Sequence, residues 1–221
     1  MKKIFLSTLV LLLSLSVSVF AQYKKKHKKR LSSQSSQITY GIMGGLNVSN
    51  VYDAYYNSFG DYNFRNGAKL GFNLGVFVDI PLIPKVHFQP EFNYSLKGYK
   101  AIADDGIFTR NYNMIDIPLL FKYYPIKHLY IYVGPQMSVK ISTYDTWTTN
   151  NSNFIQRYQR GNNNINNVYA GIATGVGIDL GSHWICNLGY AADFSKNYTD
   201  YGLDTPGFRN EVISFDFGYR F

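Results

Sequence analysis

The sequence predicts an all-β fold: a closed, antiparallel, up-and-down transmembrane β-barrel of about eight strands. Three observations favour it. After residue 36, apolar and polar residues alternate with the period of a β-strand. The alternating segments are about 11 to 14 residues long, which exceeds the usual 5–6 of soluble strands and suits a tilted membrane-crossing strand. The connections between them alternate between short turns and long polar stretches.

The first 21 residues have the layout of a cleaved signal peptide. Lys2 and Lys3 form a positive region, an apolar run covers 4–20, and Ala21 offers a small residue at the expected cleavage position. The alternative is an N-terminal membrane anchor, for which a run of about 17 residues lies at the lower limit of length. We therefore expect a signal peptide at 1–21, followed by a basic periplasmic tail at 22–37 and the barrel domain at 38–221.

The net charge of +8 belongs to the N-terminal part of the chain. Eight of the 22 basic residues precede residue 31, whereas all 14 acidic residues follow it, so the barrel domain carries 14 charges of each sign. A formally neutral domain predicts no nucleic-acid partner. The run from Lys24 to Arg30 is either a solvated tail or a contact for anionic lipid headgroups or an acidic partner.

Eight segments alternate in turn along the domain. They cover 38–48, 68–80, 86–99, 112–124, 129–141, 167–180, 184–194 and 211–221. The last is the clearest, because Ile213, Phe215 and Phe217 share one face with Tyr219 and Phe221. Polar residues fill the opposite face of the same segment.

The connections predict the orientation of the barrel. Tight turns are expected at 81–85, 125–128 and 181–183, and long polar connections at 50–67, 100–111, 142–166 and 195–210. Bacterial outer-membrane barrels have short periplasmic turns and long extracellular loops. An even number of strands then places both termini in the periplasm. Tyr and Asn in the long connections suit contact with an envelope or extracellular partner, or they only keep the loops soluble.

The polar faces indicate a membrane barrel and not a soluble one, which would need an apolar interior. We predict a polar network in the lumen formed by Lys69, Glu91, Lys97, Asp116, Lys122, Lys140, Asp216 and Arg220. Charges in a narrow lumen require partners, and eight strands enclose a space that side chains just fill. The network is therefore expected to plug the barrel, with a narrow channel for ions or small solutes as the alternative.

Aromatic residues gather toward one end of the apolar faces. They are Tyr40, Phe88, Tyr123, Trp184, Tyr219 and Phe221. A girdle at the periplasmic lipid interface is expected to have this pattern. The alternative is the general preference of aromatic residues for strands.

Short motifs follow one another along residues 40–221: 41–45, GFNLGV at 71–76, QPEFNYS at 89–95 with 97–98, IPLLFK at 117–122, YVGP at 132–135 and GYRF at 218–221. With these motifs in this order, the chain resembles the PorT-like outer-membrane β-barrel domain family of the Bacteroidetes. The resemblance implies an integral outer-membrane barrel and says little about activity. One branch of the family is tied to secretion and gliding machinery, which leaves a link to protein secretion as a further alternative. Phe221 resembles the terminal signal that barrel-assembly machinery reads.

No enzymatic chemistry is predicted. A base near the outer rim is usually His, but His27 lies in the tail and His87, His128 and His183 lie near the short turns. His87 and Glu91, four residues apart on one strand, are separated by about 13 Å and cannot share a metal. No cofactor is expected. The sequence thus favours a structural or interaction barrel in outer-membrane lipid.

Overall fold

The computed structural model describes residues 37–52, 65–103, 106–149, 152–160, 167–195 and 209–221. The expected signal peptide and most of the basic tail lie outside these residues. Within them, no helix is long and apolar enough to cross a bilayer.

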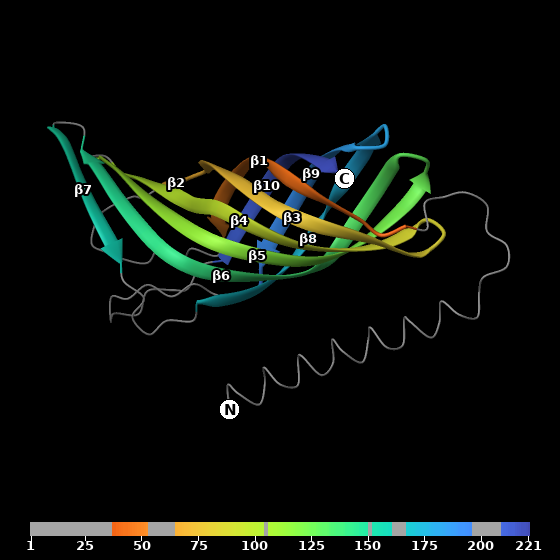
Figure 1. The fold of residues 1–221 in the computed structure, drawn as a ribbon. Coiled ribbons are helices and arrows are strands. Elements are labelled where there is room, and N and C mark those ends of the chain that lie inside the picture. The colour runs from red at the N-terminus through yellow and green to blue at the C-terminus, as the bar shows by residue number, and fades with distance from the viewer. Residues whose placement is uncertain (1–36, 53–64, 104–105, 150–151, 161–166, 196–208) are drawn as a thin grey trace, which may run out of the picture. The chain divides into compact units, whose positions relative to one another are not determined.

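Eight antiparallel strands form a closed ring (Figure 1). They are β1 (Thr39–Tyr52), β3 (Lys69–Ile83), β4 (Val86–Ala103), β5 (Gly106–Ile126), β6 (Leu129–Thr149), β8 (Val168–Leu180), β9 (Trp184–Asp193) and β10 (Arg209–Arg220). Each strand pairs with the next around the ring, and β10 pairs with β1 to close it. A closed ring has no unpaired edge, so the backbone groups of its strands bond one another. The predicted fold class is confirmed.

Two further strands lie beside the ring. β2 (Arg65–Gly67) pairs with β4, and β7 (Ser152–Arg160) pairs with the distal part of β6. Together with the long β4, β5 and β6 they extend the sheet beyond one end of the ring (Figure 1).

Two predicted connections are strands in the structure. The stretch 100–111 continues β4 and β5 as a hairpin, in which Lys100 pairs with Thr109. The stretch 142–166 contains the end of β6 and all of β7. These segments were predicted as loops because they lack an apolar face, but antiparallel strands pair through backbone hydrogen bonds that polar residues also support. The other two predicted loops, 50–67 and 195–210, lie mostly outside the described residues.

Three tight turns gather at one end of the barrel, which we call the turn end (Figure 1). They join β3 to β4, β5 to β6 and β8 to β9. Lys85, His128 and Gly181 adopt positive φ angles of 69°, 74° and 80° in these turns. The predicted short turns therefore share one end, where β1 begins and β10 ends.

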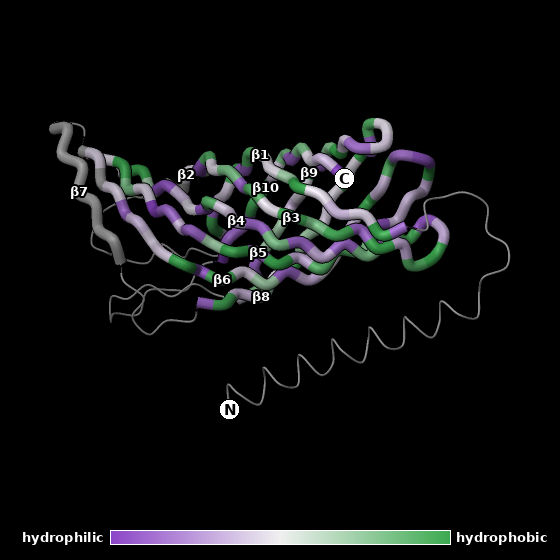
Figure 2. Tube along the Cα trace, in the orientation of Figure 1, coloured by the Kyte–Doolittle hydropathy of each residue, from purple (hydrophilic) through white to green (hydrophobic). Residues whose placement is uncertain are grey.

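Side chains alternate between the outside of the ring and its lumen. On β3, Leu70, Leu74 and Val76 are 53–66% exposed, whereas Lys69 and Asp79 are 6% and 3% exposed. Hydrophobic and hydrophilic positions accordingly alternate along the strands (Figure 2). The outside of the barrel is apolar and its interior is polar, the reverse of a water-soluble barrel.

Candidate functional site

The predicted network residues lie inside the barrel. Those that are 1–6% exposed are Lys69, Glu91, Lys97, Asp116, Lys122 and Asp216. Lys140 and Arg220 are half-buried. Strand alternation explains this placement, because the neighbours of these residues along each strand point outward.

A cluster of charged side chains occupies the lumen at the turn end. Asp79 accepts a hydrogen bond from Lys122 at 3.4 Å, contacts the ring nitrogen Nδ1 of His87 at 2.5 Å, and lies 3.7 Å from Arg220. Arg220 also donates a hydrogen bond to Asp179 at 3.0 Å. Two basic residues and two carboxylates, on β3, β5, β8 and β10, are thus joined across the barrel. We call Asp79, His87, Lys122, Asp179 and Arg220 the turn-end cluster.

Aromatic rings pack against the turn-end cluster. The ammonium of Lys122 lies 4.2 Å from the centre of the Tyr130 ring, a favourable cation–π arrangement. Tyr130 packs against Tyr124 at a centroid distance of 5.1 Å. It fits because Gly177 on β8 faces it, and a Cβ at Gly177 would overlap the ring. A large side chain on β6 therefore fills the space that a glycine on the neighbouring strand leaves.

Lys97 and Asp116 form a second ionic contact, farther from the turns. The Lys97 ammonium donates to both carboxylate oxygens of Asp116, at 2.7 and 2.8 Å, and both side chains are at least 93% buried. Ser138 donates a third hydrogen bond to the same carboxylate at 2.5 Å. The pair spans β4 and β5, and the hydroxyl comes from β6.

Amide and hydroxyl groups donate hydrogen bonds to the other two carboxylates of the predicted network. Glu91 accepts hydrogen bonds from Gln89 (2.6 Å) and Asn93 (2.8 Å). Asp216 accepts them from Asn73 (2.7 Å) and Ser214 (2.8 Å). Within the described residues neither carboxylate forms an ion pair, so these two acids differ from the ion-paired arrangement that the sequence suggested.

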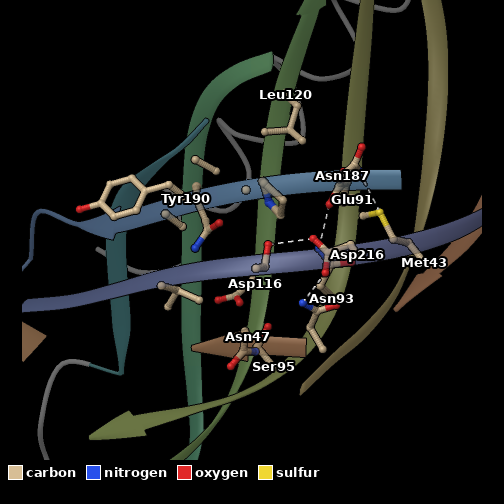
Figure 3. Close-up of a pocket in the computed structure, with 18 of the residues that line it drawn as sticks. Met43, Asn47, Glu91, Asn93, Ser95, Asp116, Leu120, Asn187, Tyr190 and Asp216 are labelled. Carbon is tan, nitrogen blue, oxygen red and sulfur yellow. Dashed lines mark hydrogen bonds between the residues drawn. The ribbon is translucent and has the colours of Figure 1, made fainter. Parts of the chain in front are cut away.

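A small cavity lies between these groups in the middle of the lumen (Figure 3). Its volume is about 70 Å³, which is enough for several water molecules. Glu91, Asp116 and Asp216 line it together with Lys97 and Asn47.

Larger side chains pack in the lumen beyond the cavity. Val51, Tyr112, Met114 and Tyr169 pack together there, each no more than 3% exposed. Lys140 lies 5.9 Å from the Tyr112 ring centre and 5.8 Å from that of Tyr169.

Five charged residues of the described interior were not in the predicted network: the buried Asp79, Arg110, Asp145 and Asp193, and the half-buried Asp179. Arg110 and Asp145 form a two-pronged ion pair with both distances 2.7 Å, on the extension of β5 and β6 that the sequence suggested to be loop. Asp79 lies on the predicted polar face of its strand. Alternation identifies its face, but its closeness to Lys122 on β5 and Arg220 on β10 depends on strand register, which alternation does not give.

The six predicted interface aromatics lie near the turn end, and four of them contact one another on the outside of the ring. Tyr40 packs against Phe221 (5.5 Å between ring centres), Phe221 against Tyr219 (5.3 Å), and Tyr219 against Trp184 (4.8 Å). The rings come from β1, β9, β10 and the residue that follows β10. Two further predicted members lie on neighbouring strands: Tyr123 is 45% exposed and Phe88 is half-buried against Phe121.

A ring of eight antiparallel strands with an apolar outside and a charged interior defines a small transmembrane β-barrel of the outer-membrane type. Residues 20–198 match the family described as "Outer membrane protein beta-barrel domain". The chain belongs to this family, which locates it in the outer membrane of a Gram-negative cell. The narrower PorT-like assignment stays a prediction.

Solved structures of small outer-membrane barrels are similar to this chain. Neisserial surface protein A is 13% identical, with 84% of this chain and 99% of the other covered and a TM-score of 0.49. The attachment invasion locus protein Ail of Yersinia pestis is 11% identical, covering 83% and 98%, with a TM-score of 0.46. OprG from Pseudomonas aeruginosa is 13% identical, covering 83% and 95%, with a TM-score of 0.40. No curated protein sequence matches the chain.

Proposed function

We propose that this barrel has a structural or interaction role in the cell envelope and that its own side chains close its lumen. One observation carries the proposal: buried charges in mutual contact occupy the lumen at more than one level. The turn-end cluster holds Lys122 and Asp79 at 3.4 Å, and the second level holds Lys97 and Asp116 at 2.7 Å. A permeation route would need these groups to separate and be hydrated.

The free energy needed to separate the buried charges supports a closed lumen. The interior of an eight-stranded barrel is just wide enough for side chains to fill it. Separating a buried ion pair without hydrating both groups leaves each charge buried and unpaired, which is costly, so opening the lumen would require water to enter it. Val51, Tyr112, Met114 and Tyr169 fill the lumen beyond the second level with apolar bulk.

A narrow channel is the second candidate, and the central cavity is the observation that favours it. The cavity has a volume of about 70 Å³, and the carboxylates Glu91 and Asp216 are part of its lining. Conduction would require it to connect past Lys97 on one side and Lys122 on the other. A role in protein secretion remains a third candidate, and it rests on the family resemblance alone.

The proposal includes an orientation and a set of partners. The turn end faces the periplasm, both termini and the tail at 22–37 are periplasmic, and the signal peptide at 1–21 is removed. Outer-membrane lipid contacts the apolar outside, and the six predicted aromatics meet the lipid interface at the turn end. Barrel-assembly machinery engages the C-terminal strand, and an envelope or extracellular partner binds the opposite end.

The protein acts without catalysis in this proposal. His87 is engaged by Asp79 inside the turn-end cluster, and His128 and His183 lie at the turns. None of these three imidazoles lies at the opposite end, where a surface substrate would arrive. His27 lies outside the described residues.

Liposome swelling tests the closed lumen. Vesicles containing the refolded full-length protein should swell no faster in isosmotic small sugars or salts than protein-free vesicles. A swelling rate that rises with protein concentration and falls as solute size increases would contradict the closed lumen and favour the channel.

A further inference from the structure

Two exposed lysines lie on neighbouring turns at the turn end. Lys85 is in the β3–β4 turn, Lys127 is at the tip of the β5–β6 turn, and both side chains are exposed. The carbonyl of Lys85 accepts a hydrogen bond from the backbone N–H of Tyr124 at 2.8 Å, and the Lys85 ammonium donates one to the carbonyl of Pro125 at 3.4 Å. These bonds hold the two turns side by side (Figure 1), so both lysines belong to one corner of the barrel, which we call the lysine corner.

The charge of the lysine corner is not balanced by acidic residues of the same turns. The stretches 80–90 and 117–130, which form both turns and the adjoining strand ends, contain no Asp or Glu. Asp79, the acidic residue just before the first stretch, is buried in the lumen and engaged inside the turn-end cluster. Within the described residues neither lysine of the corner forms an ion pair. The corner therefore presents two positive charges to its surroundings.

The Lys85 backbone adopts a conformation that favours glycine. Its φ angle of 69° lies in the left-handed region, which glycine enters without steric cost and most other residues avoid. In the β8–β9 turn a glycine, Gly181, takes a φ angle of 80°. A long basic side chain is thus present at a position where the backbone alone would favour glycine.

Apolar side chains adjoin the lysine corner on the outside of the ring. Ile83 precedes the first turn and Ile126 the second, and both are exposed. Phe121 and Tyr123 are exposed on the outside of β5, and Phe88 on β4 packs against Phe121 at 5.1 Å between ring centres. The apolar outside of an outer-membrane barrel meets lipid, and long basic side chains at its border reach the headgroup region.

We propose that the lysine corner binds one anionic phospholipid, with the headgroup phosphate between Lys85 and Lys127 and an acyl chain against Phe88, Phe121 and Tyr123. The lysine ammonium is a compact point charge that binds phosphate, and basic residues at a membrane surface attract anionic lipids. A headgroup with a net negative charge suits two ammonium groups better than a zwitterionic one, whose own cation balances its phosphate. An acidic soluble protein could meet the ammonium groups but would not cover the adjoining rings, so a lipid accounts for both parts of the surface.

The β8–β9 turn differs from the lysine corner. Its basic side chain, His183, contacts the backbone carbonyl of Arg220 through Nδ1 at 3.0 Å and stacks on Tyr219 at 5.4 Å between ring centres. We therefore expect one such lipid per chain. The inference rests on the proposed placement of the turn end at a lipid interface and adds to it the class of lipid that binds there.

Quenching of Trp fluorescence by brominated lipids measures which lipid lies at the lysine corner. The reporter is Tyr123→Trp in full-length protein whose Trp147 and Trp184 are replaced by Phe. It is refolded in mixed vesicles of phosphatidylglycerol and phosphatidylcholine, with bromine on one lipid or the other. We expect phosphatidylglycerol to bind beside the reporter about threefold or more strongly than phosphatidylcholine. A binding ratio near one would overturn the proposal.

The binding ratio is independent of the orientation and of the closed lumen. Both leaflets of the vesicles contain both lipids, so a barrel inserted in either direction meets the same mixture. A ratio near one would remove only the lipid site. A conducting barrel that keeps the ratio would contradict only the closed lumen.

Two variants and a matched control locate the lipid. Lys85→Asn, which tolerates a positive φ angle, and Lys127→Gln should each lower the ratio, and together they should bring it close to one. Lys100→Gln is the control, because it removes the same charge from the opposite end of β4 and should leave the ratio unchanged. Heat-modifiable gel mobility verifies folding of each variant. A preference that survives the double variant would belong to another part of the chain, such as the basic run at 24–30, and an equal loss in the control would show general attraction by charge; either result would contradict the site.

Discussion

Replacing Asp116 by Leu should destabilise the barrel more than any outward substitution of similar size. Leu removes the carboxylate that accepts Lys97 at 2.7 and 2.8 Å and Ser138 at 2.5 Å. Lys97, whose side chain is 4% exposed, then stays buried with no carboxylate in contact. Breaking such a pair typically costs about 3–5 kcal/mol. Urea unfolding slopes of about 2 kcal/mol/M convert this loss to a fall of about 2 M in the unfolding midpoint.

Urea unfolding of the protein in lipid vesicles, followed by Trp fluorescence, measures the effect. Phe92→Leu is the control, because Phe92 is 53% exposed on the outside of β4 and a hydrophobic swap there costs less than about 1.5 kcal/mol. The double variant Lys97→Met with Asp116→Leu should recover most of the loss, since no charge is then left unpaired. If the free energy of unfolding of the single variant Asp116→Leu, obtained with the same slope, lies within about 1 kcal/mol of the wild-type value, the reasoning is refuted.

Three further predictions concern packing, assembly and orientation. Gly177→Val should lower the free energy of unfolding by about 1–3 kcal/mol or prevent folding, because the valine side chain would overlap the Tyr130 ring. Urea unfolding indistinguishable from wild type would count against this packing. Deleting Phe221 removes its ring contacts and its backbone hydrogen bond to Tyr40 (2.9 Å). Heat-modifiable gels should then show less assembled barrel. A normal yield of assembled barrel would contradict a role of Phe221 in assembly. Two variants in a cysteine-free background test the orientation on intact cells. An impermeant thiol reagent should label Asp104→Cys, between β4 and β5, and should not label Lys85→Cys in the β3–β4 turn. The opposite labelling would show that the proposed orientation is reversed.

The ring could be predicted from the sequence because its strands have one apolar face each. Segments such as 68–80 and 211–221 alternate clearly, and they correspond to β3 and β10. The extended parts of β4, β5 and β6 could not be predicted in this way. Their stability comes from cross-strand pairs such as Lys100 with Thr109, whose residues have no apolar periodicity.

The sequence also indicated which face each lumen residue occupies, but not its partner. Lys97 is directly opposite Tyr112 on β5, and Asp116 is opposite Asn93, so the Lys97 side chain must reach along the lumen to its carboxylate. Such reach depends on strand register, tilt and the size of neighbouring side chains, which alternation does not encode. For the same reason the sequence could not predict that Glu91 bonds the amides of Gln89 and Asn93 and not a basic side chain.

Single-channel recording in planar bilayers tests the closed lumen most directly. The wild-type barrel, inserted at low protein density, should show no steady openings above the baseline of protein-free membranes, while a known porin recorded in the same membranes verifies detection. Discrete, reproducible openings that scale with the amount of inserted protein would contradict the closed lumen and make the channel the better account.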